Sequence, residues 1–167
     1  MAVLVGIDEA GFGPILGPLV VSSSTFFLAD DCVGQDLWQV LHKSLAQTRR
    51  HLRGRLLVTD SKKAHSKSMG LKHLERTVLS SLGCLGHDIR SLAQLLSALC
   101  PNCLERLHAY PWYQDLQEEC WANADPDKAI PGSVLQQDMA QKGAKRLGRE
   151  TRCLDVARYN AVVATGR

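Results

Sequence analysis

The spacing of apolar residues along the chain predicts an alternation of short strands and helices. Three apolar runs rich in β-branched residues, bounded by glycine, proline or charged residues, predict strands: residues 3–7, 17–27 and 55–59. The first strand is expected to be buried and the second to run antiparallel to it. Apolar residues three or four positions apart predict helices over residues 35–50 and 66–82, with Ser66 as the N-terminal cap of the second helix.

The pattern is less regular in the second half of the chain. Residues 88–108 have helical spacing that is interrupted at Cys100 and Pro101, and residues 109–132 are rich in tryptophan, tyrosine, proline and aspartate, which predicts an irregular segment. Three further elements are expected: a helix over residues 133–147, a strand over 152–156 and a helix over 157–165. The order of the elements predicts an α/β fold in a single domain.

Composition places the chain among ordinary globular proteins. Of its 167 residues, 45% are hydrophobic and 22% are charged, which excludes wholesale disorder, a collagen-like chain and a coiled-coil rod. No stretch has the run of about 20 apolar residues that a membrane span requires, and no basic segment with a following apolar signal region begins the chain. We therefore expect a cytoplasmic protein that does not bind membranes. Nothing in the sequence indicates an obligate protein partner.

Charge is distributed unevenly along the chain, although the formal net charge is only +3. Residues 1–40 contain five acidic residues and no lysine or arginine, whereas residues 41–80 contain ten lysines and arginines and two acidic residues. An acidic segment followed by a basic one suits a polyanion bound beside a metal site. A solvated charged face explains the same pattern. The basic block includes four closely spaced arginines that suit either role: Arg49, Arg50, Arg53 and Arg55.

The six cysteines of the chain are expected to be free thiols, as is usual in the cytoplasm. Cys100 and Cys103 have the spacing of a zinc-ligand pair. Other cysteines and histidines follow or precede this pair in the sequence: Cys84, His87, His108 and Cys120. A second pair with ligand spacing is absent, so buried or loop thiols are favoured over a zinc site.

The most informative segment is residues 6–14, with the sequence GIDEAGFGP. A strand would bring the adjacent carboxylates of Asp8 and Glu9 to its C-terminal end. Since successive strand residues point to opposite faces, both can serve one site only if the strand breaks there, and Gly11 and Gly13 would supply that break. Paired carboxylates are hard oxygen ligands suited to Mg²⁺ or Mn²⁺. Two solvated acids at an edge-strand turn are the alternative.

A second segment, residues 59–63 with the sequence TDSKK, also follows an apolar strand. The hydroxyl of Ser61 and the ammonium groups of Lys62 and Lys63 are suited to holding a phosphate. A surface turn without a ligand is the alternative, and for this segment taken alone it is the commoner situation.

Together, the two segments resemble the type 2 ribonucleases H, ribonuclease HII and ribonuclease HIII. Residues 5–21, VGIDEAGFGPILGPLVV, are similar to the strand, Asp-Glu pair, Gly-x-Gly turn, Gly-Pro and valine-rich strand with which those enzymes begin. Residues 60–63 are similar to the Asp-Ser-Lys-Lys element of the family. Residues 156–160, VARYN, are a third and weaker match, which adds Asn160 to the candidates.

The resemblance is dense over residues 3–27 and 56–80 and thin over residues 84–150, where an insertion is expected. It implies a ribonuclease H-like mixed sheet flanked by helices, in one domain over residues 1–167, and incomplete at the C-terminal end of this sequence. It also implies an endonuclease that cuts the RNA strand of RNA/DNA hybrids, or duplex DNA that contains ribonucleotides. Two Mg²⁺ or Mn²⁺ ions would serve that reaction.

Individual roles follow from the same resemblance. Asp8 and Glu9 would be the first two of four catalytic carboxylates that bind the metal ions. The substrate would be bound by two sets of residues. Backbone groups of one turn would follow the 2′-hydroxyl of the RNA: Gly11, Phe12 and Gly13. Contacts to backbone phosphates would come from the second segment: Ser61, Lys62 and Lys63. Asp60 and Asn160 are further candidates.

Two departures from the family pattern leave alternatives open. Phe12 stands where ribonuclease HII usually has arginine, and the chain has no Asp-Gly dipeptide, which commonly marks the third carboxylate. If residues 156–160 are aligned correctly, the third and fourth carboxylates fall after Arg167. A catalytically incomplete relative that binds nucleic acid, or an N-terminal fragment, explains the same motifs. A sugar-kinase-like ATPase has a similar opening, but Glu9 and the TDSKK segment argue against it.

Overall fold

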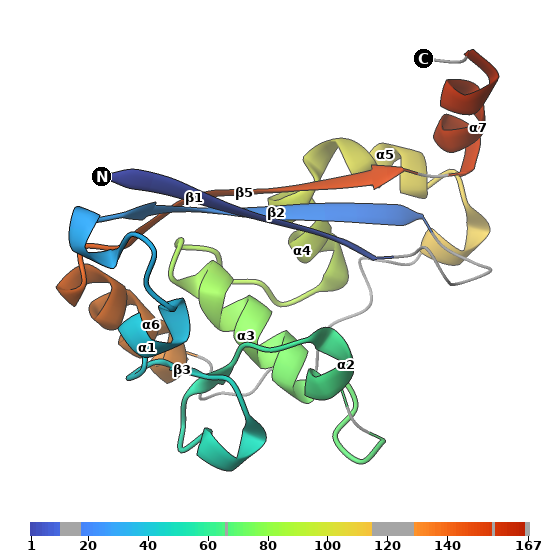
Figure 1. The fold of residues 1–167 in the computed structure, drawn as a ribbon. Coiled ribbons are helices and arrows are strands. Elements are labelled where there is room, and N and C mark those ends of the chain that lie inside the picture. Colours follow the sequence, from blue (N-terminus) through green and yellow to red (C-terminus); the bar gives the residue numbers. More distant parts are fainter. Residues whose placement is uncertain (11–17, 66, 115–128, 155, 166–167) are drawn as a thin grey trace. The chain divides into compact units, whose positions relative to one another are not determined.

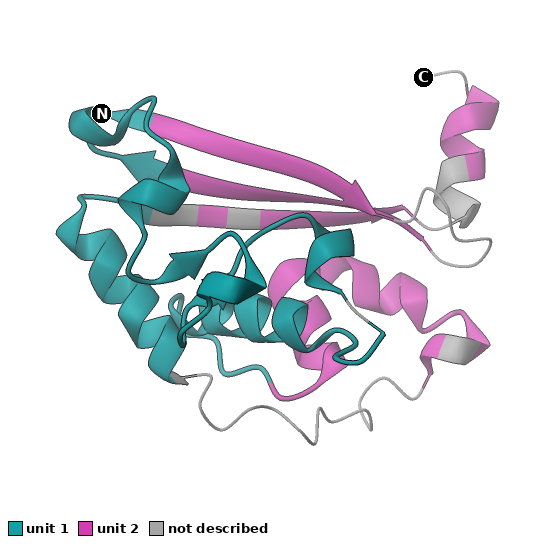
Figure 2. Ribbon diagram, turned by 60° about the horizontal axis from the view of Figure 1, so that its bottom comes forward, with its two compact units in different colours: residues 1–2, 27–89, 122–145 teal, residues 3–26, 90–121, 146–167 magenta. Residues whose placement is uncertain are grey.

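Figure 1 shows the fold in a computed structural model, which describes all residues except 11–17, 66, 115–128, 155 and 166–167. Strands and helices occur together, as expected for an α/β protein. The chain forms two compact units, each assembled from separate stretches of sequence (Figure 2). Unit 1 contains residues 1–2, 27–89 and 122–145, and unit 2 contains residues 3–26, 90–121 and 146–167. None of the described helices is both long and apolar enough to cross a bilayer.

Three long strands, most of whose residues belong to unit 2, form one sheet (Figure 1). They are β1 (Ala2–Ala10), β2 (Leu19–Leu28) and β5 (Lys145–Leu154). The sheet is antiparallel and has the order β1-β2-β5. β2 and β5 also meet through side chains, since the hydroxyl oxygens of Ser22 and Thr151 are hydrogen-bonded at 3.1 Å. Because β1 and β2 are neighbours in this antiparallel sheet, the predicted antiparallel pairing of the first two strands is confirmed.

β1 is exposed, which corrects the prediction that this strand is buried. Val3 and Ile7 expose 59% and 71% of their surface, and Val5 exposes 51%. Among the strands that the structure describes, β1 lies at the edge of the sheet and is hydrogen-bonded to β2 alone. β-branched residues favour extended backbone at an edge as well as in a core. The apolar residues of β1 therefore predicted the strand correctly, but the prediction that the strand is buried is wrong.

The helical elements in the described part of unit 2 are α4 (Leu92–Leu99), η3 (Pro101–Cys103), α5 (Leu104–Leu107), η4 (Pro111–Tyr113) and α7 (Val156–Thr165). α4 is capped by Ser91, whose hydroxyl oxygen accepts a hydrogen bond from the backbone N–H of Gln94 at 3.2 Å. The predicted break is confirmed, because the helix ends at Cys100 and Pro101 cannot continue it. α7 confirms the helix predicted near the end of the chain.

Unit 1 contains several short elements and two longer helices. In chain order they are η1 (Asp30–Cys32), α1 (Leu37–Val40), β3 (Leu45–Ala46), η2 (Arg49–His51), β4 (Leu56–Leu57), α2 (Ser61–Ala64), α3 (Lys72–Gly83) and α6 (Ala129–Gln141). β3 and β4 pair in parallel, and β4 is the strand predicted over residues 55–59. α3 packs against both β4 and α6. Leucines of α3 and β4 supply much of the buried apolar surface: Leu56, Leu57, Leu79 and Leu82.

The continuous helix predicted over residues 35–50 is wrong, since this range contains only the single α-helical turn of α1, the strand β3 and the start of the 3-10 turn η2. The chain beyond it pairs with β4, where the N–H of Leu56 donates to the carbonyl of Ser44 at 2.8 Å. The indole N–H of Trp38 donates to the carbonyl of Val58 at 2.7 Å, which ties α1 to the chain beyond β4. These bonds between distant residues override the helical spacing of the sequence.

Three other predicted boundaries are wrong by several residues. α3 begins at Lys72 and not at residue 66, because Gly70 has a left-handed backbone with φ of 54° that ends any earlier helical turn. Ser66, the predicted cap, lies outside the described residues. α6 ends at Gln141 and β5 begins at Lys145, so the helix predicted to residue 147 is too long and the strand predicted from residue 152 is too short.

Candidate functional site

Asp8 and Glu9 are exposed residues near the end of β1 in unit 2. The backbone N–H of Glu9 donates a hydrogen bond to Oδ1 of Asp8 at 3.0 Å, which restrains the Asp8 carboxylate. β1 continues as a strand through Ala10, so the two side chains leave it on opposite faces. The strand break expected after them lies outside the described residues, as does the whole turn that would follow the 2′-hydroxyl: Gly11, Phe12 and Gly13.

These two carboxylates offer the oxygen atoms that Mg²⁺ and Mn²⁺ prefer. Among the described residues, no three acidic or histidine side chains bring their ligand atoms within 4.8 Å of one another. Asp8 and Glu9 thus offer carboxylate oxygens at the end of β1, and they do not belong to any such group of three ligand side chains among the described residues. Asn160, the further candidate from the sequence, is an exposed residue of α7.

The TDSKK segment belongs to unit 1, where it follows β4 and forms α2. The carboxylate of Asp60 accepts a hydrogen bond from the backbone N–H of Lys62 at 2.8 Å, so Asp60 caps this single turn. Ser61, Lys62 and Lys63 are all exposed. One turn of backbone therefore presents a hydroxyl and two ammonium groups to solvent.

Arg49 supports this segment from η2. Its Nη2 donates to three successive backbone carbonyls, those of Lys63 at 2.9 Å, Ala64 at 3.1 Å and His65 at 2.9 Å. The guanidinium thereby fixes the end of α2 and places a third positive charge beside the two lysines. The sequence offered Arg49 only as one of four arginines and gave no sign that it acts on this turn.

The basic side chains of unit 1 also act on His73, at the start of α3. Burial lowers the pKa of His73 below its usual value, and the positive charges of Arg49, Arg76 and Lys72 lower it further. The part of this shift that comes from the three cations reflects a positive electrostatic potential at His73. Such a potential favours the approach of a polyanion.

Unit 2 contains a cluster of three thiols, which we call the cysteine cluster: Cys100, Cys103 and Cys153. Cys100 and Cys103 lie in the turn between α4 and α5, and Cys153 comes from β5. The three Sγ atoms lie within 4.8 Å of one another, and the residues are 5%, 1% and 6% exposed. Apolar side chains surround them: Leu107, Val20, Leu96 and Tyr113.

The sequence revealed only part of this cluster. The spacing of Cys100 and Cys103 marks them as a pair, but nothing in the sequence joins Cys153 to them, because the contact depends on how β5 lies beside the α4–α5 turn. Cys84, a neighbour in sequence, instead donates its thiol hydrogen to the carbonyl of Gly132 in unit 1. Cys120 lies outside the described residues, and the described cysteines are all free thiols.

Burial shapes the ionisation of the cluster. It raises the pKa of Cys103, and hydrogen bonding with Cys153 raises it further. Burial also raises the pKa of Cys153, whereas the hydrogen bond from Cys103 and the positive charge of Arg106 lower it. Arg106 also joins the two segments, since Nη1 donates to the carbonyl of Asn102 at 2.9 Å and Nη2 to that of Cys153 at 3.1 Å.

A cavity of ≈ 710 Å³ adjoins the cysteine cluster within unit 2. Cys100 and Cys153 belong to its lining, together with Arg106 and the end of β5. Glu150 is the acidic residue of this lining, and its carboxylate pairs with the guanidinium of Arg152. The cluster is thus buried from bulk solvent but lies beside a space large enough for several water molecules.

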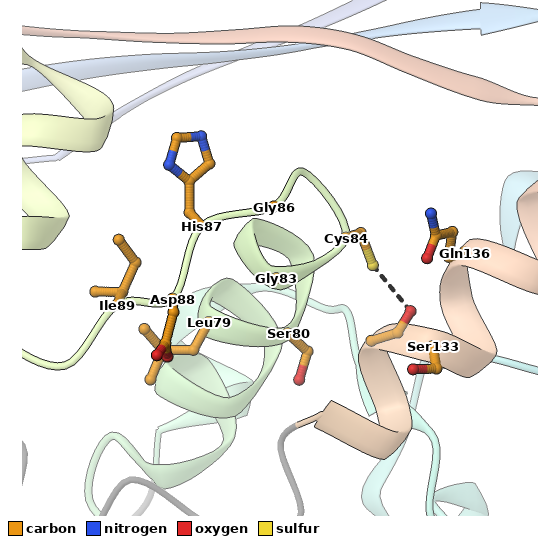
Figure 3. A pocket seen from close by; sticks show the side chains of 11 residues that line it. Leu79, Ser80, Gly83, Cys84, Gly86, His87, Asp88, Ile89, Ser133 and Gln136 are labelled. Atoms are coloured by element: carbon orange, nitrogen blue, oxygen red, sulfur yellow. Dashed lines mark hydrogen bonds between the residues drawn. The ribbon is translucent and has the colours of Figure 1, made fainter.

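A second cavity, of ≈ 350 Å³, lies between α3 and α6 in unit 1 (Figure 3). The thiol of Cys84 points toward α6, where it is 2.9 Å from the carbonyl oxygen of Gly132, whereas the imidazole of His87 points away from it. A Cβ atom at Gly132 would lie 3.0 Å from the carbonyl oxygen of Ser80, so the helices approach closely here. The Cys84 thiol and Gly132 therefore contribute to the packing of α3 against α6.

Comparisons with protein-family models, with curated proteins and with solved structures find no match for this chain. Its own residues offer three groups suited to binding or chemistry. Two are in unit 2, the carboxylates of β1 and the cysteine cluster, and one is in unit 1, the TDSKK segment with Arg49.

Proposed function

We propose that this chain is a metal-dependent endonuclease of the type 2 ribonuclease H kind, which hydrolyses the RNA strand of RNA/DNA hybrids. One observation carries the proposal: the same chain contains two charged motifs, and each of them is exposed and lies next to a strand. Asp8 and Glu9 lie near the end of β1, before the sequence GFGP, and Asp60 to Lys63 follow β4. The resemblance to ribonucleases HII and HIII rests on this combination.

The chemistry of Asp8 and Glu9 supports the proposal. Phosphodiester hydrolysis needs an activated water and a stabilised leaving oxygen, and bound divalent metal ions supply both. Asp8 and Glu9 would hold such ions through carboxylate oxygens, which are the ligand atoms that Mg²⁺ and Mn²⁺ prefer. Both residues are exposed, so a duplex can reach them. The N–H of Glu9 restrains the Asp8 carboxylate at 3.0 Å, which reduces the entropy lost when it binds an ion.

The TDSKK segment would bind the phosphate backbone of the substrate. Lys62 and Lys63 are exposed and provide two positive charges, while Ser61 provides a hydroxyl donor. Arg49 holds the backbone of this turn and adds a third charge. The pKa of His73 is lowered by burial first, and the charges of Arg49, Arg76 and Lys72, which lower it further, would also attract a phosphate backbone.

A second candidate function is binding of the hybrid without cleavage. The observation that favours it is the lack of a third acidic ligand near Asp8 and Glu9 among the described residues. A protein with half of a four-carboxylate set would retain the backbone contacts of the lysines and lose the reaction. The two candidates differ in one measurable property, which is turnover.

The deciding experiment is a cleavage assay of the 167-residue chain. The substrates are a labelled RNA/DNA hybrid and a DNA duplex with one embedded ribonucleotide, each with Mg²⁺ or with Mn²⁺. Asp8→Asn is expected to lower the cleavage rate by at least about 10²-fold, the loss typical of removing one group that stabilises the transition state. Asn retains an oxygen that can accept the hydrogen bond from the N–H of Glu9, so the strand is expected to stay intact.

Glu105→Gln is the matched control, because Glu105 is an exposed carboxylate of α5 in the same unit. Its cleavage rate should equal that of the parent chain. Equal loss in both variants would assign the effect to net charge and contradict the proposed role of Asp8. Hybrid binding without turnover in the parent chain would favour the second candidate, and the absence of both binding and turnover would overturn the two together.

A further inference from the structure

We propose that Cys100, Cys103 and Cys153 together bind a divalent metal ion of the zinc class in unit 2. This site differs in chemistry from the proposed Mg²⁺ or Mn²⁺ site, since thiolates select zinc and carboxylates select hard cations. The observation behind it is geometric. Three buried sulfur atoms, from two segments of the chain, lie within 4.8 Å of one another.

The spacing of the sulfur atoms fits a tetrahedral metal centre. Zn–S bonds of about 2.3 Å in a tetrahedron place two sulfur atoms about 3.8 Å apart, so the observed separations of at most 4.8 Å need only small side-chain rotations to close on one ion. The pair from the turn is preset, because the N–H of Cys103 donates to the carbonyl of Cys100 at 2.9 Å. Cys153 of β5 completes a three-sulfur face.

Packing alone does not account for this arrangement. A buried free cysteine behaves as a small apolar side chain with a weak hydrogen-bond donor. Filling the space between Leu96, Leu107 and Tyr113 requires volume, and alanine, valine or serine would supply it. Three sulfur atoms from two segments of the chain converge on one point. Packing does not require this convergence, whereas binding of a soft metal ion does.

Charge and protons balance when such an ion binds. Each thiol releases one proton to solvent as its sulfur bonds to the metal, and a divalent ion with three thiolates carries a net charge of −1. Arg106 is the compensating cation, and its charge already favours the thiolate form of Cys153. It also holds both ligand-bearing segments through Asn102 and the backbone of Cys153. The raised pKa of Cys103 means that the metal must displace its proton, which a bound zinc ion does readily.

A water molecule from the adjoining cavity of ≈ 710 Å³ completes the tetrahedron. The carboxylate in the lining of that cavity, Glu150, is engaged with Arg152, so it leaves the fourth position to water. The ion would fasten the α4–α5 turn to β5 and so stabilise unit 2. The fourth position would remain exchangeable, as in zinc sites that keep one non-protein ligand.

The test measures metal content directly. The full chain is purified with reducing agent, exposed to Zn²⁺, passed through a desalting column and analysed by elemental mass spectrometry. We expect one zinc per chain in the parent protein and none retained in Cys103→Ser. Cys84→Ser is the matched control, because Cys84 is a free thiol of unit 1 outside the cysteine cluster. It should retain one zinc.

Two further measurements keep the test decisive. If Cys103→Ser does not fold, alkylation of the native parent chain replaces it: Zn²⁺ should protect the three cluster cysteines in peptide mapping, a chelator should remove that protection, and Cys84 should react equally in both states. Asp8→Asn should also retain one zinc, which separates this site from the proposed nuclease site.

Three outcomes would overturn the proposal. The folded parent chain could retain no zinc, Cys103→Ser could retain as much zinc as the parent, or two cluster cysteines could be found in a disulfide under the same reducing conditions. Failure of hybrid cleavage would leave this result untouched, since zinc content is measured without substrate.

Discussion

Both units of the protein contain a buried contact between segments that are far apart in the sequence, and two of these contacts differ chemically. In unit 1, Oδ2 of Asp138 accepts hydrogen bonds from the backbone N–H of Ser44 at 3.0 Å and from its hydroxyl at 2.8 Å. In unit 2, the three thiols of the cysteine cluster come together in an apolar setting. Strong donors meet a strong acceptor in the first contact, whereas weak donors face one another in the second.

The two contacts differ in how far their own polar groups pair with one another by hydrogen bonds. Ser44 and Asp138 satisfy each other, apart from Oδ1 of Asp138, which has no hydrogen-bond partner among the described residues. This contact ties α6 to the segment before β4 through direct hydrogen bonds. The cysteine cluster gains little from its own hydrogen bonds and is suited to a metal ion. A buried polar contact and a buried ligand set can therefore be distinguished by how well their members pair with one another.

The largest expected effect is stabilisation of unit 2 by zinc. At a free concentration about a thousandfold above its dissociation constant, a ligand that binds only the folded state adds about 4 kcal/mol to the free energy of unfolding. Urea denaturation should show this increase in the parent chain and in Cys84→Ser, but not in Cys103→Ser. Hydrogen exchange should slow in α4, α5 and β5 and stay unchanged in β3 and α6. Equal slowing of hydrogen exchange in both units would contradict a zinc site that is confined to unit 2.

The next effect concerns the contact in unit 1. Asp138→Ala should lower the free energy of unfolding by about 1–3 kcal/mol, because the buried N–H of Ser44 loses its acceptor. The hydroxyl of Ser44 loses less, since it also donates to the carbonyl of Leu41 at 3.2 Å. Asp138→Asn keeps an oxygen acceptor and should cost less than Asp138→Ala. Equal losses in the two variants, measured by urea denaturation, would contradict this role for the carboxylate oxygen.

A smaller effect is expected from the exposed lysines, in contrast to the buried contacts. Lys62→Ala should weaken binding of an RNA/DNA hybrid and reduce the slope of log K against log salt by about 0.9, the value for one lost phosphate contact. Its folding stability should not change, because Lys62 is exposed. Lys145→Ala, also an exposed lysine of unit 1, is the control and should leave the slope unaltered. Fluorescence anisotropy over a salt series measures both variants.

The smallest effect is a pH dependence from His73. Its pKa is lowered in the folded state from the usual value of 6.5, by burial first and by nearby cations second. The unfolded chain therefore takes up the proton at a higher pH than the folded chain, so stability is complete above pH 6.5 and falls as the pH drops through that value. NMR titration should also show the pKa rising when the hybrid neutralises the nearby cations. An unchanged pKa on binding would place the hybrid elsewhere.

Local patterns in the sequence were sufficient for elements that depend on few distant contacts. The strands β1 and β2 and the helix α7 were predicted from apolar spacing, and the break after α4 from Pro101. The helix expected over residues 35–50 failed, because Ser44 is bonded to Leu56 of the neighbouring strand and to Asp138 of α6. Helical spacing carries no information about such partners.

The candidate sites also fall into those that a local sequence pattern marks and those that depend on contacts between distant residues. Asp8 and Glu9, and Ser61 to Lys63, are adjacent in the chain, so a motif could mark them before any fold was known. Cys153 could not be found in this manner, since it reaches the turn of Cys100 and Cys103 only through the packing of β5, where Arg106 of α5 donates to its backbone carbonyl. Arg49 was visible as a charge, but its bonds to the carbonyls after Lys62 required the fold of η2 and α2.

The spacing of Arg106 and Cys153 along the chain has a consequence for biosynthesis. They are 47 residues apart, and β5 is also an edge strand of the long sheet. At about 5–20 residues per second, a ribosome needs roughly 2–9 s to add that stretch. For that interval the nascent chain has the turn with its two thiols but not the third, so the cysteine cluster can form only after β5 has been synthesised. Zinc capture by this protein would then report that β5 has docked beside the turn.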